Sequence, residues 1–74
     1  MKLINAPINE TLYILNYTGG KGVASKLRQL GLCPGRKTKV LRYAPMGGPV
    51  MVEVGGRSVA IGRGIAARIE VEKI

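Results

Sequence analysis

The chain has 74 residues, and its twelve Lys and Arg outnumber four acidic residues, all Glu, to give a formal net charge of +8 with no His. This length fits one domain over residues 1–74 with a thin core, which leaves little room for a deep enzymatic cleft. The lack of His and Asp excludes a Ser-His-Asp triad, a Cys-His pair and a zinc cluster built on His.

A first strand is predicted over residues 11–17, because TLYILNY is rich in β-branched and aromatic side chains. Leu12 and Ile14 would share one face of this strand. The residues before it include Asn5 and Pro7, which indicate an extended lead-in.

The apolar pattern changes to a helical period between Gly22 and Leu30. Apolar side chains recur there at positions i, i+4 and i+7 and form one stripe, which consists of Val23, Leu27 and Leu30. Lys26 and Arg28 lie off this stripe and would face water. The sequence therefore predicts a short amphipathic helix over residues 22–30.

The single cysteine lies in a stretch of turn residues, LGLCPGRK. Gly31 suits the left-handed residue that follows a helix, and Leu32 can then fold back onto Leu27. Cys33 would begin a type II turn, because Gly35 supplies the positive φ that this turn needs. No His is present to activate the thiol or to share a metal, so Cys33 is interpreted as a small buried residue.

Three further strands are predicted over residues 37–43, 50–54 and 57–61. In the first of them, Thr38, Val40 and Arg42 would share one face, and in the second the three valines would point inward. The pair Gly55-Gly56 predicts a two-residue hairpin of type I′ between the last two.

The loop APMGGP, residues 44–49, would expose Met46 at a tip flanked by glycine. Residues 62–67 are predicted to form an irregular or single-turn connection, and RIEVEKI, residues 68–74, alternates as a fifth strand. Five short strands with few connecting residues predict a small barrel, because closure leaves fewer exposed strand edges.

Composition also limits the compartment and the partner. A single cysteine cannot form an internal disulfide, and no run approaches the ~18 apolar residues of a membrane span, so we expect a cytoplasmic protein. The positive charge favours nucleic acid, an anionic membrane surface or an acidic protein. A nucleic-acid-binding barrel is one alternative, although the basic residues show no continuous stripe with stacking aromatics.

Three stretches resemble the FeoA family of ferrous iron transport protein A: KLRQLGLCPGRKTKVLRYAPMGGPV, VEVGGRSVAI and AARIEV. The resemblance covers nearly all of the chain. It implies a mainly β fold, a small SH3-like barrel of about five strands with one short inserted helix, and neither a catalytic residue nor a cofactor. It also implies a role beside FeoB, a large membrane GTPase that transports ferrous iron, through contact with the cytosolic region of FeoB.

A metal-responsive regulatory domain is the second alternative, since the resemblance extends to the terminal domains of metal-dependent repressors and the family is often described as metal-binding. Stable divalent-metal sites need several converging ligands. This chain has one Cys, four scattered Glu and no His, so we assign no metal ligand.

The expected contact surface consists of the helix edge and the loop around Met46. Lys26, Arg28 and Arg42 would meet acidic patches on the partner, which affects the association rate more than the affinity. Met46 would add a soft and adaptable apolar contact. The sequence leaves open whether the chain self-associates and whether it activates or inhibits its partner.

Overall fold

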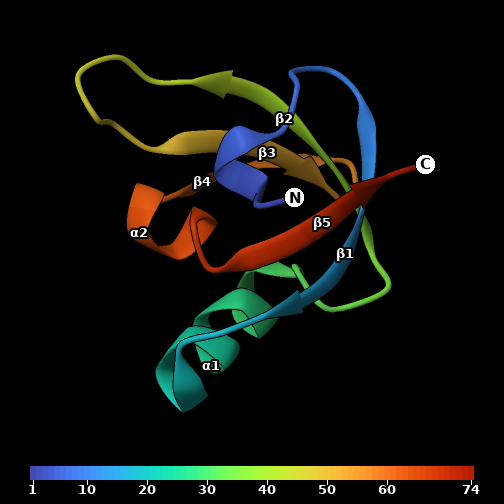
Figure 1. Ribbon diagram of the computed structural model, residues 1–74, viewed down its shortest axis with the longest axis vertical. Coiled ribbons are helices and arrows are strands. Elements are labelled where there is room, and N and C mark those ends of the chain that lie inside the picture. Colours follow the sequence, from blue (N-terminus) through green and yellow to red (C-terminus); the bar gives the residue numbers. More distant parts are fainter.

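The computed structural model describes residues 1–74 as a strongly curved antiparallel sheet with three short helices (Figure 1). The strands are β1 (Thr11–Tyr17), β2 (Lys37–Tyr43), β3 (Val50–Val54), β4 (Arg57–Ile61) and β5 (Ile69–Lys73). The helices are the 3-10 helix η1 (Leu3–Asn5), α1 (Gly20–Leu30) and α2 (Arg63–Ala66). The first four strands have the predicted bounds, and β5 is one residue shorter at each end.

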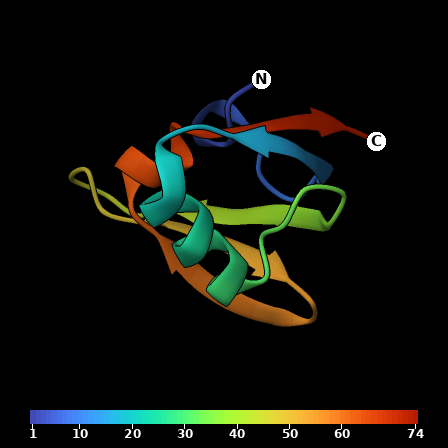
Figure 2. The ribbon, with the colours of Figure 1, turned by 90° about the horizontal axis from the view of Figure 1, so that it is seen from below.

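The strand order is β4-β3-β2-β1-β5, and every neighbouring pair is antiparallel. Figure 2 shows β1 and β5 on one side of the molecule and β2, β3 and β4 on the other, with α1 beside the space between them. The prediction of a small five-stranded barrel with an inserted helix is confirmed. β4 and β5 are the two edges of the sheet, and α2 connects them.

Alternation along the strands fills the core, which contains fourteen buried apolar residues. Leu12 and Ile14 of β1, which were predicted to share one face, are both buried. The three valines of β3 are buried as predicted. Full burial of one aliphatic side chain contributes about 1.5–3 kcal/mol, so these strands gain most of their stability from one face.

The segment before β1 differs from the predicted extended lead-in, because it contains η1 and buries Leu3 completely. A distant side chain holds it: the Tyr43 hydroxyl is within hydrogen-bond distance of the carbonyl oxygens of Leu3 and Ala6. Burial raises the pKa of Tyr43, while the bond to Ala6 and the Arg63 guanidinium act in the opposite direction.

Helix α1 begins at Gly20, two residues before the predicted start, and buries Leu27. Its end follows the prediction, because Gly31 has a φ of 83° and its amide donates to the Arg28 carbonyl. The Leu32 amide donates to the Leu27 carbonyl at 2.9 Å, and the Leu32 side chain is buried. This is the bonding of a Schellman motif.

A bulge in β2 overturns the prediction that Arg42 shares a face with Thr38 and Val40. The pairing of β2 with β3 shifts register between Val40 and Arg42, and the shift turns Arg42 to the solvent. Cys33 begins the predicted turn, with its carbonyl accepting from the Arg36 amide at 3.0 Å, but its side chain is half-buried rather than buried.

Candidate docking surface

The loop of residues 44–49 connects β2 to β3 and projects from the body of the molecule in both views (Figures 1 and 2). The Gly48 amide donates to the Pro45 carbonyl at 3.1 Å, and between them Met46 and Gly47 have φ values of 58° and 73°. Two consecutive positive φ values define a type I′ turn. The Met46 side chain at its tip is fully exposed, at 103%.

Arg63, the first residue of α2, fixes the base of this loop. Its Nε donates to the Gly48 carbonyl at 3.0 Å, and its Nη2 donates to the Ala44 carbonyl at 3.1 Å. A Cβ on Gly48 would lie 2.8 Å from the Ala44 Cβ, so the close approach of the two loop ends requires glycine there. Sequence reasoning missed Arg63, because the carbonyls that it binds lie 15 and 19 residues earlier in the chain.

The four predicted contact residues are exposed, but they form two separate patches rather than one. The loop patch consists of Met46, which lies in the loop, and Arg42, which lies near the end of β2 beside it. The helix patch consists of Lys26 and Arg28, which lie on α1. Figure 1 shows the loop and α1 toward opposite ends of the molecule. One flat partner surface therefore cannot cover both patches without enclosing much of the barrel between them.

Most of the positively charged side chains have no carboxylate partner within the chain. Only Lys2 and Lys73 among the twelve Lys and Arg form ion pairs with a carboxylate, with Glu70 and Glu10 respectively. The N-terminal amine also binds Glu70, at 2.7 Å. The basic side chains of both patches are therefore available to an acidic surface.

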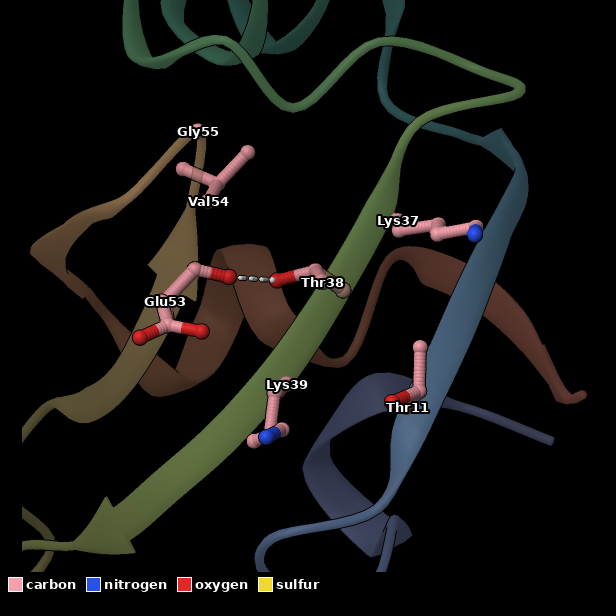
Figure 3. A pocket seen from close by; sticks show the side chains of 7 residues that line it. All are labelled: Thr11, Lys37, Thr38, Lys39, Glu53, Val54 and Gly55. Carbon is pink, nitrogen blue, oxygen red and sulfur yellow. Dashed lines mark hydrogen bonds between the residues drawn. The ribbon is translucent and has the colours of Figure 1, made fainter.

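A hollow of about 250 Å³ lies where β2 and β3 separate, and Figure 3 shows the side chains that line it. The Thr38 hydroxyl donates to the Glu53 carbonyl at 2.8 Å and bridges the two strands at this point. Lys37 and Lys39 point in different directions in Figure 3, so they do not converge on one ligand position. No nucleophile with an adjacent base lines the hollow, which gives it no evident acid–base chemistry.

The chain contains no group of three or more His, Cys, Asp or Glu side chains placed to hold a metal ion. No helix has the length and apolar character that crossing a membrane requires.

A small, strongly curved five-stranded antiparallel sheet with short helices defines an SH3-like barrel. Residues 1–73 match the model of the FeoA domain family. The chain belongs to the FeoA family, that of ferrous iron transport protein A, which supports an accessory role in iron uptake.

The chain is also similar to individual known proteins in sequence and in structure. The chain is 36% identical over 63 residues to a protein of Methanocaldococcus jannaschii named "Putative Fe(2+) transport protein A", with 85% of this chain and 74% of that protein covered. It is similar to a crystal structure of the iron uptake regulatory protein FeoA, with a TM-score of 0.91, 36% identity, and 100% and 97% of the two chains covered. It is also similar to Stenotrophomonas maltophilia FeoA in complex with zinc, described as an SH3 domain protein, with a TM-score of 0.79, 25% identity, and 97% and 89% covered.

Proposed function

We propose that this protein is a cytoplasmic accessory protein of ferrous iron uptake that binds the cytosolic region of the FeoB membrane GTPase and modulates it. Membership of the ferrous iron transport protein A family carries this proposal. The protein acts by binding rather than by catalysis, since its exposed features are basic and apolar contact groups.

Electrostatics supports an acidic partner. The helix patch and the loop patch contribute three cations without a carboxylate within 4 Å. Such cations steer diffusional encounter with an acidic surface, and charge reversal lowers the association rate more than it raises the dissociation rate. Met46 then adds an apolar contact at the end of a fixed loop.

Charge reversal in the helix patch tests this proposal. In Lys26→Glu/Arg28→Glu, we expect the association rate with the purified cytosolic region of FeoB to fall about tenfold at low salt. The melting temperature should change little, because both side chains are exposed. Surface plasmon resonance at two salt concentrations measures the rates. Lys37→Glu/Lys39→Glu is the matched control, because it changes the net charge equally on a strand.

Equal association rates for the wild type and a folded helix-patch variant would contradict the assigned patch. Equal losses in both double variants would show that net charge alone matters. If the wild type binds RNA or DNA more tightly than FeoB, with a steep loss of affinity as salt rises, the nucleic-acid alternative replaces the proposal.

A further inference from the structure

Met46 has a backbone conformation that its residue type disfavours. Type I′ turns favour Asn, Asp or Gly at their central positions, because at positive φ the Cβ atom crowds the following carbonyl oxygen. Gly has no Cβ, and the short polar side chains of Asn and Asp offset the crowding with local hydrogen bonds. Met46 has a φ of 58° in such a turn. Within the chain nothing compensates for this, since the Met46 side chain is fully exposed and joins no apolar cluster.

Arg63 keeps this unfavourable tip in one position. Its guanidinium bonds the carbonyls of Ala44 and Gly48, which lie on the two sides of the turn. The loop also has a backbone bond of its own, from the Ala44 amide to the Pro49 carbonyl at 3.0 Å. Strain that a surrounding structure holds in place is typical of contact and switch sites.

We propose that Arg63 is a positioning residue that fixes residues 44–49 as a rigid projection, with Met46 inserting into an apolar socket that has an acidic rim on a protein partner. This inference rests on the proposed function and names the contact. An apolar tip needs an apolar socket, while Arg42 beside the loop, the cationic Arg63 at its base and the absence of acidic residues in the loop favour an acidic rim. A second copy of this chain, also with a charge of +8, is electrostatically unfavourable as that partner.

Substitution of Met46 by Asn tests the strained tip, because it should move stability and affinity in opposite directions. Met46→Asn suits a type I′ turn, so we expect a higher melting temperature. It removes the apolar side chain, so the Kd for the cytosolic region of FeoB should rise at least tenfold. Met46→Leu keeps the apolar side chain and should bind within about threefold of the wild type. Calorimetric melting and titration calorimetry measure the two effects.

Substitution of Arg63 by Lys tests the positioning role. Lys keeps the positive charge but lacks the planar fork that reaches both carbonyls. We expect faster hydrogen exchange at the Gly48 amide and an affinity about fivefold weaker. In a Met46→Gly background, Arg63→Lys should have no further effect on affinity, because the tip of the loop then has no side chain to insert into the socket. Arg68→Lys, at a side chain without a hydrogen bond in this structure, is the matched control.

The outcomes separate this inference from the proposed function. If the wild type binds FeoB and Met46→Asn binds equally well, the inference is wrong and the proposed function stands. A lower melting temperature for Met46→Asn overturns the strained tip whatever the partner. If the wild type does not bind FeoB, both fail. Met46-dependent binding to vesicles of phosphatidylcholine and phosphatidylserine, or Met46-dependent dimerisation in sedimentation, would replace the protein socket with a membrane or a second copy.

Discussion

Two residues other than glycine have a positive φ, and they differ in what holds them there. Asn9 tolerates the left-handed region well, and its amide donates to the Val40 carbonyl at 2.8 Å. Met46 belongs to a residue type that avoids this region, and its side chain contacts nothing. The fold therefore accounts for the conformation of Asn9, whereas the strained conformation of Met46 is the observation on which the proposed partner contact rests.

Gly31 and Gly22 allow a paired test of backbone conformation within one helix. Gly31 ends α1 with a φ of 83°, so Gly31→Val should lower the free energy of unfolding by more than about 1 kcal/mol. Gly22 lies inside α1, where an added Cβ meets nothing within 4 Å, so Gly22→Ala should raise it by about 0.5–1 kcal/mol. Urea unfolding measures both changes. Destabilisation by both substitutions would show that α1 is strained at its start as well as at its end.

At the scale of elements, the salt bridges of Glu70 join β5 to the N-terminal segment. Hydrogen bonds from the N-terminal amine and then from Lys2 hold the pKa of the Glu70 carboxyl below its usual range. A lowered pKa in the folded state stabilises the protein above the unfolded pKa, about 4.3, and this contribution disappears as pH falls through the folded value. The stabilisation is therefore present at pH 7 and is lost in acid.

Glu70→Gln tests this link. Between pH 7 and pH 5 the wild type should melt at a higher temperature than the variant, and the difference should shrink below about pH 4.3. Thermal melts across the pH range measure it. Glu72→Gln, at a carboxylate without an ion pair, is the control and should show a smaller pH-dependent difference. A constant Glu70→Gln difference from pH 7 to pH 3 would show that the ion pairs do not form in solution.

The strands were predictable because their signals are local. The alternation of valines with Met and Glu predicted which face of β3 is buried. The pair Gly55-Gly56 predicted the hairpin between β3 and β4, and both glycines have a positive φ, of 59° and 79°. The bulge in β2 was not predictable from KTKVLRY, because it depends on pairing with β3. The start of α1 was missed because Gly19 precedes it without a side-chain cap, so the usual residue signal is absent.

The candidate site was predictable only in part, because much of it depends on contacts between residues that lie far apart in the chain. The exposure of Met46 follows from its glycine-flanked loop. Its strained φ and its support by Arg63 follow from contacts between α2 and the β2–β3 loop, which no local pattern encodes. The burial of η1 likewise depends on Tyr43, which lies about half the chain away.

At the scale of the whole molecule, the fold leaves its own charge largely unneutralised. Its longest extent is 28 Å, and ten of its twelve Lys and Arg have no ion pair with a carboxylate. The Debye length is about 30 Å at 0.01 M ionic strength and about 10 Å at 0.1 M. At low salt the cations therefore repel one another across the entire molecule, and at moderate salt only close neighbours do.

Salt should therefore affect folding and partner binding in opposite directions. Raising KCl from 0.01 to 0.5 M weakens the internal repulsion, and each 1 kcal/mol gained raises the Tm of a domain of this size by about 4–8 °C. The same increase should weaken binding to an acidic partner, because it screens the attraction. Calorimetric melts and titrations over one series of KCl concentrations measure both effects.

Lys37→Glu/Lys39→Glu separates internal repulsion from general salt effects, because it lowers the net charge from +8 to +4. If repulsion is the cause, the Tm of this variant should rise less steeply with KCl than that of the wild type. If the Tm of the variant and that of the wild type rise equally with KCl concentration, the salt acts through hydration or through binding of chloride to the folded state. A wild-type Tm that falls as KCl rises would mean that attractive pairs outweigh repulsion, against the few ion pairs in the structure.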